Sequence, residues 1–318
     1  MADPLALIVA GPTGSGKSGL ALDIAERVGG TVINADAMQV YRELRILTAR
    51  PGPAVEARVP HRLYGVRPAA CPGDVAWWRG AALAAMDEAR LGGRLPILCG
   101  GSGLYLTALT EGLAPIPLVA AAARAEAREL LARVGPQALH ARLAAADPRT
   151  AGKLRPSDGQ RVARAWEVWR STGIGLATWQ SRAAEPAPWR FAVILLAPDR
   201  AMLRAAIADR FAGMMEAGAL DEVRALLAQG LAGDLPVMRA LGVPALAAHA
   251  QGEIGLEQAV RRAVLATGQY AKRQTTWFRH HSLTAGEKVH TICSLYDGWA
   301  QFSEQLSPGI INFVDTRC

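Results

Sequence analysis

The residue pattern with the most specific chemistry is GPTGSGKS, at Gly11–Ser18, which directly follows the apolar run Leu5–Ala10. An apolar strand, then GxxxxGK[ST], then a helix is the context of a phosphate-binding P-loop. The glycines let the backbone turn its amide hydrogens inward, and the helix that begins near Lys17 adds the positive end of its dipole. The Ser18 hydroxyl is the usual Mg²⁺ ligand of such loops. The predicted phosphate-binding residues are Gly11, Pro12, Thr13, Gly14, Ser15, Gly16, Lys17 and Ser18.

The loop alone does not identify a reaction, because kinases, ATPases and GTPases share it. The sequence has no NKxD motif for guanine and no apolar strand of Walker B type that ends in Asp. The apolar run Leu95–Cys99 ends instead in glycines, in the stretch Gly100–Gly103. These absences disfavour an ordinary nucleotide hydrolase. They leave open an enzyme that holds pyrophosphate as a leaving group.

A carboxylate, Asp36, follows the β-branched run Thr31–Asn34. Open α/β sheets bind their ligands at the carboxyl ends of the strands, so we expect Asp36 to lie beside the P-loop. There it could orient a Mg²⁺-bound water or act as a general base towards an amine or hydroxyl. The other interpretation is structural, with Asp36 as the N-cap of the segment Ala37–Tyr41.

The elements that must position these residues alternate between strands and helices. The predicted strands are Leu5–Ala10, Thr31–Asn34, Leu95–Cys99 and Phe191–Leu196, and helices are expected at Lys17–Val28 and Val75–Arg90. This alternation predicts an α/β fold with a P-loop NTPase-like parallel sheet flanked by helices. Further helices are expected at Arg200–Ala217, Leu220–Gln229 and Gly255–Arg279.

Residues 116–188 lack strand signals and are rich in Ala, Leu and Arg at helical spacing, which predicts an all-helical insertion domain. The catalytic core then comprises residues 1–115 and 189–281. The last stretch, 282–318, has no clear periodicity, and we expect a loosely packed tail without an assigned function.

The charge is distributed unevenly. The chain of 318 residues has 35 basic and 28 acidic residues. Between Val119 and Arg182 there are eleven Lys or Arg and five Asp or Glu, and Arg261–His281 has five basic residues and no acidic ones. Each cluster could be an ordinary solvated face, but together they indicate a polyanionic partner.

No apolar run approaches the roughly 20 residues that a membrane span needs, so no membrane association is expected. The four cysteines form no CxxC pair, which favours a reducing cytoplasm over a zinc site or a disulfide framework. These cysteines are Cys71, Cys99, Cys293 and Cys318. We take a monomer as the default state.

Several motifs occur in an order that resembles the tRNA dimethylallyltransferases, also called the IPP transferase family. After GPTGSGKS come INADAMQVYR, LTARP and LPILCGGSGLYL. SDGQRVARAWEV, IADRFAGMMEAG, MRALGVPAL and QYAKRQTTWFR follow, so the resemblance covers about residues 5 to 279.

The resemblance implies transfer of a dimethylallyl group from dimethylallyl diphosphate to the exocyclic amine of the adenosine immediately 3′ of the tRNA anticodon, with release of pyrophosphate. The P-loop and Mg²⁺ would hold the leaving diphosphate, with Lys17 and Ser18 as catalytic residues. The family's catalytic carboxylate falls on Asp36. Arg210 would reach the diphosphate or the transition-state charge, and its structural alternative is a surface salt bridge. Ser102 would contact the diphosphate or the target nucleotide, with a tight strand-to-helix turn as its alternative.

The resemblance also implies contacts to the anticodon stem-loop of tRNA, whose target adenosine must be flipped out of its stack. The implied contact residues are Asp36, Ala37, Met38, Gln39, Ser102, Arg124, Gln160, Arg161, Val162, Ala163, Arg164, Arg239, Lys272, Arg273 and Gln274. For the arginines of the insertion, the structural alternative is a solvated helix face. Five positions depart from the family pattern, because Ala37 replaces Ser, Arg50 replaces Lys, Ser102 replaces Thr, Ser157 replaces Asn and Gly268 replaces Arg.

Three other hypotheses stay open on the sequence. The first is the same chemistry on a free adenine nucleotide, against which the basic helical insertion argues. The second is a P-loop kinase of a small metabolite, which would need an arginine-rich lid for ATP. The third is a non-catalytic RNA-binding module, which the combination of Lys17, Ser18 and Asp36 disfavours.

Overall fold

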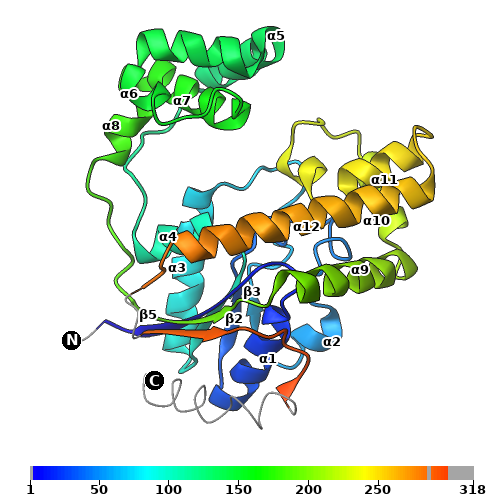
Figure 1. Ribbon diagram of the computed structural model, residues 1–318. Helices are drawn as coiled ribbons and strands as arrows, with labels where there is room; N and C mark the ends of the chain where they lie inside the picture. Colours follow the sequence, from blue (N-terminus) through cyan, green and yellow to red (C-terminus); the bar gives the residue numbers. More distant parts are fainter. Residues whose placement is uncertain (1–2, 285–287, 300–318) are drawn as a thin grey trace. The chain divides into compact units, whose positions relative to one another are not determined.

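The computed structural model of the protein (Figure 1) describes residues 3–284 and 288–299. The chain divides into two compact units, of which the first comprises residues 1–110 and 187–318 and the second Glu111–Pro186. The insertion predicted from the sequence spans residues 116–188. In the described part of the chain, no helix is long and apolar enough to cross a membrane.

The first unit is built on a parallel sheet with the strand order β3-β2-β4-β1-β5-β6, which confirms the predicted fold class. Its strands are β1 (Leu5–Ala10), β2 (Thr31–Asn34), β3 (His61–Arg62), β4 (Pro96–Gly100), β5 (Arg190–Leu196) and β6 (Val289–Ile292). Every described pair of neighbouring strands is parallel, so the carboxyl ends of all six strands lie at one edge.

The helices of the first unit lie between the strands in sequence and follow β5. They are α1 (Lys17–Val28), α2 (Pro53–Glu56), α3 (Val75–Leu91), α4 (Gly103–Thr110), α9 (Arg200–Glu216), α10 (Ala219–Leu227), the 3₁₀ helix η1 (Pro236–Arg239), α11 (Val243–Ala250) and α12 (Leu256–His280). In Figure 1, α12 is the long orange helix, and its described contacts include both α9 and α11.

The alternation of side chains along β1 separates two hydrophobic cores. Ala6, Ile8 and Ala10 belong to the core that also contains Trp78 of α3. Leu7 and Val9 belong to the opposite core, which α1 covers with Leu20 and neighbouring residues. Because both faces of the sheet are covered, its strands are continuous apolar runs, and this is why they could be predicted from sequence.

The structure corrects the sequence analysis in the segment 282–318, where we expected only a loosely packed tail. Val289–Ile292 forms β6, an edge strand that pairs with β5 through Val193–Val289 and Leu196–Ile292. Ile292 is 1% exposed and belongs to the core under α1. Residues 285–287 and 300–318, with Cys318, lie outside the described residues.

The second unit is entirely helical within its bounds. It contains α5 (Ala121–Ala146), α6 (Pro148–Ala151), α7 (Gly159–Thr172) and α8 (Leu176–Gln180). The long α5 is kinked where Gly135 takes φ 77° before Pro136. A core of its own, which includes Leu139, Leu143 and Val162, packs α5 against α7. The unit therefore has the packed interior of an independent helical domain.

Candidate active site

The P-loop joins β1 to α1 and has the backbone shape that its glycines predict. Gly14 and Gly16 have φ values of 86° and 87°, a region that side chains other than glycine's rarely allow. Gly16 is the N-cap of α1, and it makes no side-chain capping bond to the first turn. The first amide hydrogens of α1 therefore remain available to an anion, together with the positive end of the helix dipole.

Two cations converge on this loop from different elements. The Lys17 ammonium group donates to the Pro12 carbonyl oxygen at 3.4 Å. The Arg210 guanidinium group, from α9, donates to the Thr13 hydroxyl at 2.5 Å. The pKa values of Lys17 and Arg210 are both lowered, mainly because the groups are buried. The nearby Asp36 carboxylate opposes this shift in each case. Arg210 thus lies at the P-loop and not in a surface salt bridge.

Asp36 is held by its neighbours at the end of β2. Its backbone N–H donates to the Asn34 side chain at 2.8 Å, and its carbonyl accepts from the same side chain at 3.0 Å. The carboxylate oxygen Oδ1 accepts from the N–H groups of Met38 at 2.8 Å and Gln39 at 3.4 Å. Oδ1 therefore caps the turn, as the structural interpretation expects, while Oδ2 accepts no hydrogen bond from the described residues.

Asn34 belongs to the site although the sequence analysis gave it no role. It is fully buried, and its amide group also donates to the Leu63 carbonyl at 3.1 Å. The backbone carbonyl of Asn34 accepts a hydrogen bond from the Trp78 indole N–H at 2.8 Å. An asparagine in an otherwise apolar strand was the available signal, since a buried amide must find partners.

Ser102 and Tyr270 lie near Asp36. The Ser102 hydroxyl accepts from the Ala37 N–H at 3.0 Å and lies near the Tyr270 hydroxyl. Burial raises the pKa of Tyr270 to about 12, and the Asp36 charge acts in the same direction. Tyr270 was missed in sequence, where only Lys272, Arg273 and Gln274 of the run QYAKRQ were assigned to the site.

Gln274 connects the P-loop to the glycine loop after β4. Its side-chain oxygen accepts from the Thr13 N–H at 2.8 Å, and its amide nitrogen donates to the Gly101 carbonyl at 2.9 Å. The residue is 5% exposed. This corrects the prediction that Gln274 contacts tRNA, since both ends of its side chain are used inside the protein.

Ser18 is exposed at the start of α1, and the buried Cys99 thiol donates to the Lys17 carbonyl at 3.7 Å. Burial raises the pKa of Cys99 to about 11, so this thiol stays protonated. The described residues contain no group of three or more His, Cys, Asp or Glu that could hold a metal ion. Cys71 and Cys293 are exposed free thiols.

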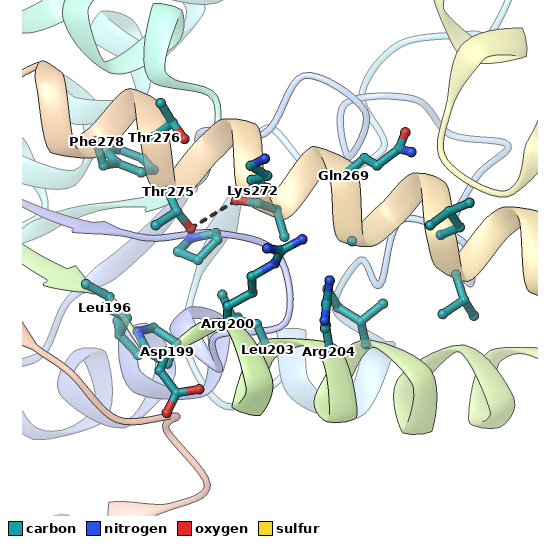
Figure 2. Close-up of a pocket in the computed structure, with 18 of the residues that line it drawn as sticks. Leu196, Asp199, Arg200, Leu203, Arg204, Gln269, Lys272, Thr275, Thr276 and Phe278 are labelled. Carbon is teal, nitrogen blue, oxygen red and sulfur yellow. Dashed lines mark hydrogen bonds between the residues drawn. The ribbon is translucent and has the colours of Figure 1, made fainter.

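A cavity of about 1240 Å³ opens between α9 and α12 and reaches Pro12 of the P-loop. Figure 2 shows Arg200 and Arg204 pointing from α9 towards α12. The lining is apolar around Leu203 and its neighbours, with basic side chains on both helices. The residues that carry charge in this lining are Arg200, Arg204, Arg261, Lys272, Arg279 and the single acid Asp199.

Gly268 lies in the lining of this cavity on α12. A Cβ atom at this position would meet nothing within 4 Å. The arginine that the family pattern has here would therefore have room, and its replacement by glycine enlarges the cavity instead of relieving a clash.

The remaining predicted contacts of the first unit differ in accessibility. Ala37, Met38 and Gln39 are partly exposed, and the Gln39 amide nitrogen donates to the Thr48 carbonyl at 2.8 Å. Arg239 is exposed and donates to the Asp234 carbonyl at 3.1 Å, which holds its end of η1. Lys272 and Arg273 are exposed on α12, and the Arg273 guanidinium lies 5.7 Å from the Tyr270 ring centroid.

The predicted contacts of the second unit lie on α5 and α7. Arg124 and Arg164 converge on the Glu167 carboxylate, at 3.7 and 2.5 Å. Arg161 pairs with Asp158 at 3.4 Å and keeps 77% of its side chain exposed. Gln160 is exposed and Ala163 is partly exposed. Val162 is fully buried in the helical core, so its side chain supports α7 and does not meet RNA, contrary to the prediction.

This fold and this site define a P-loop α/β protein in which a carboxylate and two cations surround the phosphate loop and a separate helical unit carries arginines. The family described as "IPP transferase" matches residues 39–281, and that described as "Isopentenyl transferase" matches residues 4–66. The chain therefore belongs to the IPP transferase family.

Individual relatives match over nearly the whole chain. The tRNA dimethylallyltransferase of Granulibacter bethesdensis is 56% identical over 315 residues, which cover 99% of both chains. That of Gluconobacter oxydans is 58% identical over 313 residues, covering 98% of this chain and 94% of the relative. The crystal structure of the full-length tRNA isopentenylpyrophosphate transferase from Bacillus halodurans, 29% identical, superposes with a TM-score of 0.69, covering 99% of this chain and 98% of that one.

Proposed function

We propose that this protein transfers the dimethylallyl group of dimethylallyl diphosphate to the exocyclic amine of the adenosine 3′ of the anticodon in tRNA. The observation that carries the proposal is the position of Asp36, whose charge acts on both Lys17 and Arg210 at the P-loop. A carboxylate oxygen without a hydrogen-bond partner among the described residues thus lies beside a binding site for a diphosphate leaving group. Transfer of carbon from a diphosphate to an amine needs these two features together.

The reaction then follows from the residues present. The diphosphate is bound by the amide hydrogens of the loop and by Lys17 and Arg210. The bond between the first prenyl carbon and the diphosphate oxygen breaks, and its electron pair leaves with pyrophosphate. The amine nitrogen forms the new bond to that carbon, and its proton passes to Oδ2 of Asp36. The caps from Met38 and Gln39 fix the carboxylate in place.

Mg²⁺ fits this site as a partner of the diphosphate. The chain offers the exposed Ser18 hydroxyl, a hard oxygen ligand, and no complete protein cage among its described residues. This suits Mg²⁺, which usually binds through few protein groups together with substrate phosphates and water. When bound, the ion neutralises charge on the leaving diphosphate.

The cavity between α9 and α12 is the proposed entry for the donor. Its apolar lining, with Leu203 and Ile207, suits a prenyl chain, and the arginines from α9 attract the diphosphate. The cavity reaches Pro12, so the diphosphate end arrives at the P-loop. Asp36 and Ser102 do not line this cavity, and the adenosine would be received beside them, where Ser102 accepts from the Ala37 N–H.

The tRNA would be held by its phosphates on the arginines of the second unit. Arg161 is largely exposed, and Arg124 and Arg164 share a single carboxylate, so the Arg124–Arg164–Glu167 cluster keeps a net positive charge. Such a face supports backbone contact, which positions a nucleic acid without specifying its sequence.

A transfer assay with magnesium, labelled dimethylallyl diphosphate and an unmodified anticodon stem-loop tests the proposal. We expect label in the RNA with the wild-type chain and a loss of at least about 10²-fold with Asp36→Ala, the ordinary contribution of a general base. Full-rate transfer by Asp36→Ala would remove the general-base assignment. Transfer to free AMP but not to the stem-loop would favour the free-nucleotide hypothesis.

A further inference from the structure

The segment that follows β6 lies directly against the P-loop. The Tyr296 backbone N–H donates to the Ser15 carbonyl at 3.0 Å. Tyr296 is 8% exposed and belongs to the core that α1 covers. A residue close to the end of the described chain therefore forms part of the wall behind the phosphate-binding backbone.

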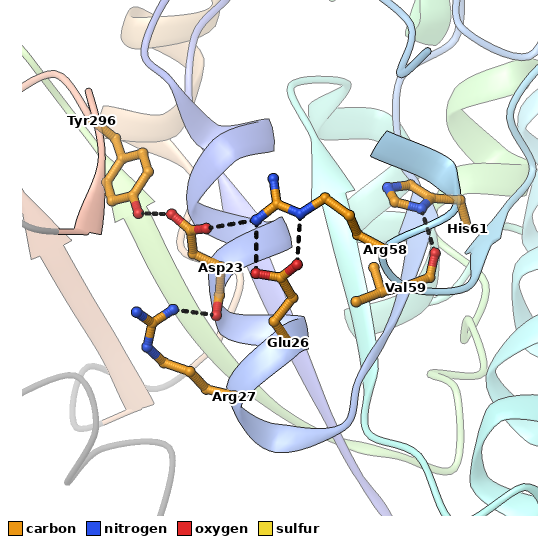
Figure 3. Close-up of polar contacts among 7 residues, drawn as sticks. All are labelled: Asp23, Glu26, Arg27, Arg58, Val59, His61 and Tyr296. Carbon is orange, nitrogen blue, oxygen red and sulfur yellow. Dashed lines mark hydrogen bonds and ion pairs between the residues drawn. The ribbon is translucent and has the colours of Figure 1, made fainter. Parts of the chain in front are cut away.

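The Tyr296 side chain fastens this contact to α1. Its hydroxyl donates to an Asp23 carboxylate oxygen, and Asp23 in turn faces Arg58 at 3.7 Å (Figure 3). Arg58 also pairs with Glu26 at 2.6 Å, so the tyrosine joins a network along the helix. Its ring lies over Gly19, where a Cβ atom would come within 3.3 Å of the ring carbons.

The P-loop glycine Gly16 is shaped by this contact as well as by its own backbone. A Cβ atom on Gly16 would lie 2.1 Å from the Tyr296 carbonyl oxygen and 2.8 Å from its Cβ. Those distances exclude any larger residue while Tyr296 occupies its place. Gly16 thus has two reasons to be glycine, its φ of 87° and the close approach of Tyr296.

The bond to Ser15 also fixes the direction of an amide hydrogen. In a trans peptide the carbonyl and the N–H of one unit point in opposite directions. When Tyr296 holds the Ser15 carbonyl on the outer side of the loop, the Gly16 N–H of the same peptide points to the inner side. Among the described residues, the Gly16 N–H has no hydrogen-bond acceptor, so it is available to a phosphate oxygen.

We propose that Tyr296 is a positioning residue for the diphosphate, because it holds the Ser15–Gly16 peptide in the orientation that presents the Gly16 N–H to the ligand. This inference rests on the proposed function, in which the loop binds the donor's diphosphate. Because the Tyr296 backbone N–H makes the contact to the Ser15 carbonyl, the substitution that tests the proposal is one that removes this N–H. The ring and hydroxyl keep that N–H in place.

The test is the affinity of the full-length chain for inorganic pyrophosphate with magnesium, measured by calorimetry. Tyr296→Pro removes the N–H, and we expect the pyrophosphate Kd to rise about tenfold, the value of one charge-assisted hydrogen bond at the lower end. Affinity for the anticodon stem-loop stays unchanged. The matched control is Trp299→Ala, which removes a ring 3.7 Å from the Arg27 guanidinium in the same segment, and should change the Kd by less than about twofold.

Hydrogen exchange provides a second measurement on the wild-type chain, which decides the matter even if Tyr296→Pro does not fold. By linkage, pyrophosphate should slow exchange of the Gly16 N–H and also of the Tyr296 N–H. Wild-type chain that does not bind pyrophosphate would refute the loop assignment in the proposed function. Wild-type binding with an unchanged Kd in folded Tyr296→Pro, or with an unaltered Tyr296 exchange rate, would overturn this inference alone.

Discussion

Gln274 gives the sharpest prediction for the site, because its one side chain bonds both the P-loop and the glycine loop after β4. Gln274→Met keeps the length of the side chain and removes both hydrogen bonds. The Thr13 N–H and the Gly101 carbonyl then lose their partners in a buried setting. Each of the two unpaired buried groups costs about 1–3 kcal/mol, so the free energy of unfolding should fall by about 2–6 kcal/mol if the loops stay in place.

The loops can avoid that cost only by moving to find other partners, and movement would misplace the phosphate-binding amides. We therefore expect a lower melting temperature, a pyrophosphate affinity reduced about tenfold or more, or both. Gln274→Glu should be worse than Gln274→Met for the Gly101 contact, since a carboxylate oxygen would face a carbonyl oxygen. Gln258→Met, exposed on the same helix, is the matched control.

The assay combines thermal unfolding with pyrophosphate calorimetry for the two variants and the control. Gln274→Met that retains both the wild-type melting temperature and the wild-type pyrophosphate affinity would refute the positioning role. A loss of stem-loop affinity with an unchanged pyrophosphate affinity would return Gln274 to the direct tRNA contact that the sequence suggested.

Three further outcomes follow from the same geometry. Because the pKa of Tyr270 is raised to about 12, its hydroxyl is neutral and can donate a hydrogen bond below that pH. The phenol becomes a negatively charged phenolate only above it. Tyr270→Phe should therefore lower the transfer rate without changing the shape of the pH–rate profile between about pH 7 and 10; a lost ionisation in that range would contradict this. Arg161→Ala with Arg164→Ala should weaken stem-loop binding and reduce its salt slope by about 1 per phosphate contact, while Arg133→Ala, whose pairing with Glu129 lies within α5, should not. Gly100→Ala should lower the free energy of unfolding by more than about 2 kcal/mol, because the new Cβ would lie 2.0 Å from the Ala35 carbonyl oxygen. An unchanged midpoint of chemical denaturation would show that β2 and β4 can move apart to accept the methyl group.

The strands and helices with strong local signals could be predicted from sequence. Leu5–Ala10, Thr31–Asn34 and Lys17–Val28 have the predicted bounds, since continuous apolar runs and a glycine loop leave little choice of structure. His61–Arg62 and Val289–Ile292 were not predicted as strands. Both are short edge strands, which depend on pairing with a neighbour more than on their own composition.

The candidate site was predictable in its charged members and not in the groups that hold them. Lys17, Arg210 and Asp36 come together as expected, because a P-loop and strand ends share one edge of the sheet. Asn34 and Tyr296 were missed, and Gln274 was assigned to the ligand instead of to the protein. Their roles arise from hydrogen bonds between residues that are far apart in sequence, which a local pattern cannot reveal. The Ser15–Tyr296 bond, for example, spans 281 residues.

The most direct measurement of the central claim is the position of the product in a full tRNA. An unmodified tRNA transcript, dimethylallyl diphosphate and magnesium are incubated with the wild-type chain, and the RNA is cut into defined oligonucleotides for mass spectrometry. The account predicts one dimethylallyl group, on the adenosine immediately 3′ of the anticodon, and formation of that product at least about 10²-fold more slowly with Asp36→Ala. A prenyl group elsewhere in the tRNA, no prenyl group at all with the wild-type chain, or a phosphoryl group in its place would contradict it.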